Sequence, residues 1–135
     1  MTPSPWNSFG GSDGWLNLVH VFGGIEIAQT YSAFFWLDRC FIEHPQLECA
    51  MELGTLYGAL SSYLGLCFPG RVVTCDNQDH RKPHARALHK RLGVHFKLAN
   101  VLRESAPKDL LSLCRAKIGY SKKSSLFLFC DNGGK

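Results

Sequence analysis

Short apolar runs alternate with segments of helical periodicity along most of this chain. The runs predict strands at residues 49–51, 72–75, 94–98 and 125–130. The segments between them have apolar positions every three or four residues, which predicts helices at 60–67, 83–92 and 107–118. A further helical pattern covers Ile25–His44 and ends at Pro45. Strands that alternate with helices predict an α/β fold with a doubly wound, mostly parallel sheet.

An acidic residue follows each of the first two predicted strands. Glu52 follows the first, and Asp76 follows the second, eighteen residues beyond Gly58. Glycines 54 and 58 allow a sharp turn and a close approach of the backbone to a ligand. An acid in the position of Asp76 can accept both hydroxyls of a ribose, and Glu52 could receive an ammonium group. This pattern predicts a nucleotide-cofactor site, while the glycines by themselves also suit a plain strand-to-helix turn.

The same residues resemble a known family. The segment ELGTLYGALS at 52–61 is similar to the E-x-G-T-x-x-G-x-x-S form of the first motif in class I S-adenosylmethionine-dependent methyltransferases. It is most similar to the branch of cephalosporin-hydroxylase-like and sugar or macrolide O-methyltransferase proteins, and VVTCD at 72–76 resembles the second motif. The resemblance implies a Rossmann-like sheet, S-adenosylmethionine as cofactor, and methyl transfer to an oxygen of a small molecule or sugar.

The resemblance also implies which residues contact the cofactor. Glu52 would face its methionine end and Asp76 would bind the ribose. The remaining implied contacts are made by the glycine loop and by two loops near the adenine, at Gly54, Thr55, Gly58, Asn77, Asn100 and Val101.

Residues after the fourth predicted strand are implied to meet the methyl acceptor or a metal. Asp131 would act as a base or as a ligand of Mg²⁺, and Lys135 would stabilise a developing alkoxide. A zinc site at His80 and His84 is not favoured, because Pro83 lies between them and marks a helix start.

The resemblance covers nearly the whole chain but only the first part of the usual family domain. We therefore expect a loop or cap at residues 1–24 and a partial domain at 25–135, truncated after its fourth strand. In the family's strand order, 3-2-1-4-5-7-6, that strand would be an open apolar edge able to pair in a homo-oligomer. Two alternatives remain: a non-catalytic nucleotide-binding or interaction module, and an NAD-dependent oxidoreductase, which the departure from G-x-G-x-x-G disfavours.

Charge is unevenly distributed along the sequence. Between Arg81 and Lys123 there are twelve Lys or Arg residues and two acids, in a chain of formal net charge +4. This stretch would suit an anionic partner such as RNA, or it forms solvated faces of two helices on one side of the sheet. We favour the second interpretation, because few aromatic residues lie nearby to stack on bases.

The composition also indicates a cellular setting. No apolar run is long enough to span a bilayer, and the N-terminus has no basic segment followed by an apolar one. Six cysteines without a C-x-x-C pair suit reduced thiols, four of them within apolar segments. We expect a cytoplasmic protein without membrane contact.

Overall fold

The structure is a computed structural model that describes residues 21–27 and 31–130. Its elements, in chain order, are β1 (Val21–Phe22), β2 (Ile25–Glu26), α1 (Tyr31–Glu43), β3 (Cys49–Leu53), α2 (Ala59–Cys67), β4 (Val72–Asp76), α3 (Pro83–Leu92), β5 (Val94–Leu98), α4 (Ala106–Ile118) and β6 (Leu126–Cys130).

Four strands form a parallel sheet in the order β5-β4-β3-β6. This confirms the expected doubly wound α/β fold. The chain first moves from β3 outward to β5 and then returns to place β6 on the other side of β3. The carboxyl end of β3 therefore lies at the point where the winding reverses, which is where open α/β sheets usually bind their ligands.

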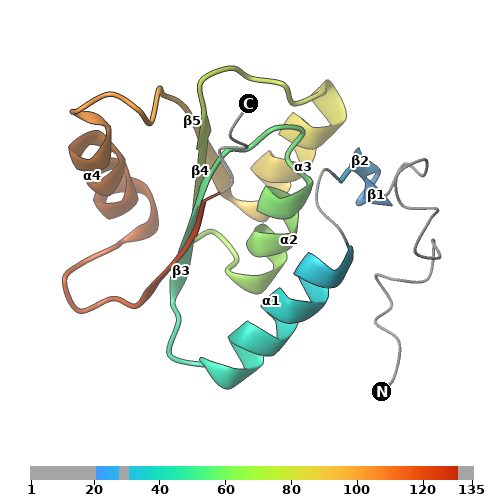
Figure 1. The fold of residues 1–135 in the computed structure, drawn as a ribbon, viewed down its shortest axis with the longest axis horizontal. Helices are drawn as coiled ribbons and strands as arrows, with labels where there is room; N and C mark the ends of the chain where they lie inside the picture. Colours follow the sequence, from blue (N-terminus) through green and yellow to red (C-terminus); the bar gives the residue numbers. More distant parts are fainter. Residues whose placement is uncertain (1–20, 28–30, 131–135) are drawn as a thin grey trace.

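The sheet has a helical layer on each face (Figure 1). Helices α1, α2 and α3 pack on one face, in a core that contains Phe34, Leu64 and Ala85. Helix α4 packs on the other face, where Cys114 contributes to a second core. The expectation that the two basic helices share one side of the sheet is therefore wrong. Right-handed connections put α4 on the opposite face, because the chain reverses its direction across the sheet after β5.

The helix expected over Ile25–His44 is wrong in its first part. Ile25–Glu26 is a strand that pairs with Val21–Phe22, and α1 begins only at Tyr31. Gly23 and Gly24, with φ of 57° and 80°, form the turn between these strands, as suits a tight hairpin. Ile25 and Ile27 are buried while Glu26 is exposed, so the local period is two, as in a strand.

Two further features of the described residues bear on the expected setting. No helix within 21–27 and 31–130 combines the length and apolarity needed to cross a membrane. All six cysteines are free, and Cys49, Cys75 and Cys114 are buried. Burial raises the pKa of both Cys75 and Cys114 to about 11, so these two thiols remain protonated at neutral pH.

Candidate functional site

The loop between β3 and α2 is held in an unusual backbone conformation. Gly54, Leu56 and Gly58 all have positive φ, at 103°, 49° and 92°. The amides of Gly54 and Thr55 both donate to the carbonyl oxygen of Cys75, at 2.8 and 3.2 Å, so the loop is attached to the end of β4. A left-handed conformation at a residue with a side chain, such as Leu56, costs roughly 1–2 kcal/mol. The surrounding contacts must offset that cost.

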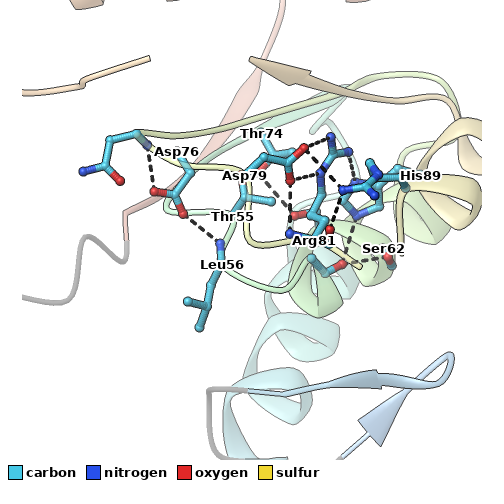
Figure 2. A network of polar contacts seen from close by, with 12 residues as sticks. Thr55, Leu56, Ser62, Thr74, Asp76, Asp79, Arg81 and His89 are labelled. Carbon is cyan, nitrogen blue, oxygen red and sulfur yellow. Dashed lines mark hydrogen bonds and ion pairs between the residues drawn. The ribbon is translucent and has the colours of Figure 1, made fainter. Parts of the chain in front are cut away.

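Asp76 provides the contact that fixes Leu56. Its Oδ2 accepts a hydrogen bond from the Leu56 amide at 2.9 Å, and its Oδ1 accepts one from the Asn77 amide at 2.8 Å (Figure 2). The structure therefore brings the acid at the end of β4 onto the glycine loop after β3, two features that were singled out from the sequence. Each carboxylate oxygen can accept a second hydrogen bond, and Asp76 is only partly buried.

Glu52 lies deeper, in a cluster of hydroxyl groups. Its side chain is 1 % exposed, and its Oε1 accepts hydrogen bonds from Ser61 Oγ and, at 2.6 Å, from Thr74 Oγ1. Because a carboxylate oxygen only accepts, Thr74 uses its single proton on Glu52 and must accept from Thr55 Oγ1, 2.6 Å away. The cluster ties the ends of β3 and β4 to the loop and to α2.

A small cavity separates Glu52 from the hairpin. It measures about 10 Å³ and is lined by Glu52, by loop residues 55–58, by the start of α2 and by Glu26. This is space for roughly one water molecule. Contact between Glu52 and a ligand's ammonium group stays a prediction. In this structure, the cavity beside the Glu52 carboxylate has room for about one water molecule.

A second polar network fixes the other end of the loop. Arg81 binds Asp79 through two nitrogens, at 2.9 and 3.0 Å, and its guanidinium lies 4.0 Å from the centre of the Phe96 ring. A third nitrogen, Nη1, donates to Nδ1 of His89 at 3.1 Å (Figure 2). The hydrogen bonds from the Arg81 side chain to Asp79 hold the pKa of Asp79 below its usual value.

The arginine decides the tautomer of His89. A guanidinium only donates, so Nδ1 of His89 accepts and the proton resides on Nε2, which donates to the Gly58 carbonyl at 3.0 Å. His89 is 1 % exposed, and burial lowers its pKa. The neutral imidazole thus anchors the last glycine of the loop.

Gly58 is required by this contact. A Cβ on Gly58 would lie 2.8 Å from Cε1 of His89, so the space that the glycine leaves is directed at the imidazole. Its packing against His89 is enough to explain the glycine.

Replacement of Gly58 by alanine is expected to reduce the free energy of unfolding by about 3 kcal/mol. Roughly 1–2 kcal/mol comes from the positive φ of 92°, and the rest comes from the overlap with His89. Gly70 is a matched control, because its φ is 71° but nothing lies within 4 Å of an added Cβ. Urea denaturation should show a loss of only about 1 kcal/mol for Gly70→Ala. Equal losses at the two positions would contradict the contact with His89.

The buried imidazole should also make stability depend on pH. Because the folded pKa of His89 lies below its usual 6.5, the unfolded chain binds more protons as the pH falls below about 6.5. The free energy of unfolding should therefore decrease from about pH 6.5 downward. The pKa of His95 is also lowered, by burial and by Lys117, so it contributes in the same direction.

Urea midpoints measured between about pH 7.5 and 5.5 check this expectation. His89→Gln should flatten the acid decline more than His95→Gln, because His95 is less buried. A decline that is as steep in His89→Gln as in the unchanged chain would rule out this role for His89.

Of the remaining residues implied by the resemblance, some lie at the glycine loop's edge of the sheet and others lie outside the described residues. Asn77 follows β4, and Asn100 and Val101 follow β5, so all three lie at the same sheet edge as the glycine loop. Asn100 Oδ1 accepts from the Leu102 amide at 3.0 Å, and Val101 packs against the α4 core. Asp131 and Lys135 lie outside the described residues.

The metal candidates can be placed in part. His80 precedes α3, and His84 lies in its first turn with Nε2 2.6 Å from the Gly23 carbonyl oxygen. Over residues 21–27 and 31–130, no group of three or more metal-ligating side chains comes together. Asp131 stays a predicted Mg²⁺ ligand.

The sequence-based reasoning missed Thr74, Arg81 and His89. The sequence holds one signal for Thr74, which is a hydroxyl residue within an apolar strand. In the structure it pairs in register with Glu52. Arg81 enters the sequence analysis only through the count of Lys and Arg residues, and His89 only as one of several histidines without a ligand pattern.

Comparisons of this chain with protein-family models, with curated proteins and with solved structures gave no match in any of the three. The functional interpretation therefore depends on the fold and on the site geometry.

Proposed function

We propose that this chain binds S-adenosylmethionine at the carboxyl ends of β3 and β4 and serves methyl transfer to an oxygen atom of a small molecule or sugar. One observation carries the proposal: the carboxylate of Asp76, at the end of one parallel strand, contacts the left-handed loop that follows the neighbouring strand. This arrangement lies where the winding of the sheet reverses.

The donor and acceptor groups at this edge suit the cofactor. Asp76 retains acceptor capacity on both oxygens, which matches two neighbouring ribose hydroxyls. Glu52 provides negative charge near the start of α2, on the side proposed for the positively charged methionine end. Gly54 brings the backbone close to this edge without a side chain.

In the proposed reaction, the cofactor and the residues of the chain have separate roles. The cofactor, when bound, supplies an activated methyl group on a sulfonium centre. The residues of this chain hold it in one orientation, so that an acceptor oxygen can approach in line with the bond that breaks. Asp131 and Lys135 stay the candidates for the acceptor end.

Isothermal titration with S-adenosylhomocysteine tests the proposal, with NAD as competitor. We expect saturable binding that NAD does not displace, because NAD has no ammonium group to balance the charge of Glu52. Binding of NAD without binding of S-adenosylhomocysteine would favour an oxidoreductase. Binding of neither ligand by the folded chain would favour the non-catalytic module.

A further inference from the structure

A larger cavity lies beside the glycine loop and is not used by the proposed function. It measures about 220 Å³ and is lined by hairpin residues 24–26, by Tyr57 and by Lys82, His84 and Ala85 at the start of α3. Pockets for drug-sized ligands are usually about 300–1,000 Å³. This cavity therefore suits a smaller molecule, of about the size of an amino acid.

The walls of the cavity are held in place without a ligand. Nε2 of His84 lies 2.6 Å from the carbonyl oxygen of Gly23, which fastens the hairpin to α3. A Cβ on Gly24 would lie 2.8 Å from the same nitrogen, so the two elements are in close contact. Ile25 and Ala85 are buried in the core at 4 % and 2 % exposure. The cavity is therefore largely preformed.

Two opposite charges line this cavity on different walls. Glu26 belongs to β2, and Lys82 immediately precedes α3. Within the described part of the chain, neither side chain forms an ion pair, with the other or with any third group. No side chain caps the start of α3, whose first backbone amides add positive potential beside Lys82. The lining also includes the apolar side chains of Ile25, Tyr57 and Ala85, of which Tyr57 is the most exposed.

We propose that this cavity binds a small zwitterion of the amino-acid class with an apolar or aromatic side chain. Its ammonium group contacts the carboxylate of Glu26, and its carboxylate contacts Lys82 and the first turn of α3. Its side chain lies against Tyr57. The inference goes beyond the proposed function, because Lys82 and the start of α3 line this cavity and not the small cavity at Glu52, while Glu26 and Tyr57 lie between the two cavities and line both.

Three probes of one shape test the charge pattern on the full chain. L-Phenylalanine carries both charges, phenethylamine lacks the carboxylate, and 3-phenylpropionate lacks the ammonium. In titrations followed by amide chemical shifts, we expect L-phenylalanine to bind at least about tenfold more tightly than either of the others. Shifts should centre on the hairpin, Tyr57 and the start of α3. Equal affinity for the three probes, or no binding of L-phenylalanine, would overturn the proposal.

Charge-removing variants assign each end of the ligand. Glu26→Gln should weaken the binding of L-phenylalanine and of phenethylamine about tenfold and leave the binding of 3-phenylpropionate unchanged. Lys82→Met should weaken the binding of L-phenylalanine and of 3-phenylpropionate about tenfold and leave the binding of phenethylamine unchanged. Glu104→Gln and Lys108→Met are matched controls on exposed residues away from the cavity. Similar losses in the controls would show a general charge effect and contradict the site. Titration of Lys82→Met with S-adenosylhomocysteine reports separately on the proposed function, because Lys82 does not line the small cavity at Glu52.

Discussion

Replacement of Glu52 by alanine is expected to reduce the free energy of unfolding by about 4 kcal/mol. The carboxylate is 1 % exposed and accepts hydrogen bonds from Ser61 and Thr74, so its removal takes away the acceptor of Thr74 and leaves Ser61 only its longer contact with Thr74 Oγ1, at 3.3 Å. Each lost hydrogen bond costs about 1–2 kcal/mol, and the cavity that remains adds roughly 1 kcal/mol. Urea denaturation followed by circular dichroism gives the difference directly.

Two further variants separate the causes of this loss. Glu52→Gln keeps one acceptor oxygen and nearly the same volume, so it should cost about half as much as the alanine variant. Glu48→Ala removes an exposed acid immediately before β3, which is paired with Arg71 at 3.8 Å, and should change stability by less than about 0.5 kcal/mol. A loss at Glu52 no larger than that at Glu48 would mean that the hydroxyl cluster contributes little.

Local signals in the sequence were enough to predict most of the elements. Helix α3 covers Pro83–Leu92 as expected, because proline suits the first turn and Gly93, with φ of 70°, ends the helix. The apolar runs also gave β4 and β5 nearly residue for residue. Where proline and glycine mark the ends of an element and apolar residues recur at a regular spacing, local sequence is enough to predict the element without knowledge of distant contacts.

The hairpin shows where local reasoning failed. Apolar residues from Ile25 onward fit a helical period, but Ile25 and Ile27 are both buried at strand spacing. The hairpin is fixed partly by His84, sixty-one residues away, through its contact with Gly23. A contact at that separation leaves no trace in a local pattern, and the placement of α4 likewise depended on the order of the strands.

The candidate site divides in the same way. Asp76 and the glycine loop were predictable, because the carboxyl ends of neighbouring parallel strands, and the loops that follow them, lie at the same edge of the sheet. His89 was not, since its partner Gly58 lies thirty-one residues earlier and its burial follows from helix packing. What distinguishes this loop is therefore its support from two sides, by Asp76 at Leu56 and by His89 at Gly58.

The support from Asp76 leads to the largest effect expected on binding. Asp76→Ala should weaken S-adenosylhomocysteine at least about 100-fold in isothermal titration. Two hydrogen bonds from ribose hydroxyls to a charged acceptor contribute about 1.5 kcal/mol or more each, which corresponds to that factor. The variant also frees the Leu56 amide, so the left-handed loop loses the contact that offsets its cost.

Two variants distinguish the lost ribose contact from a rearranged loop. Asp76→Asn keeps an oxygen that can accept from the Leu56 amide but loses the charge and one acceptor. Its affinity for S-adenosylhomocysteine should therefore lie between those of the unchanged chain and of Asp76→Ala. Asp109→Ala removes an exposed acid in α4, on the opposite face of the sheet, and should bind as the unchanged chain does. If Asp76→Ala retained full affinity, the ribose would lie elsewhere and the proposed orientation of the cofactor would be wrong, because the other strand-end acid, Glu52, is already committed to the buried hydroxyls of Ser61 and Thr74.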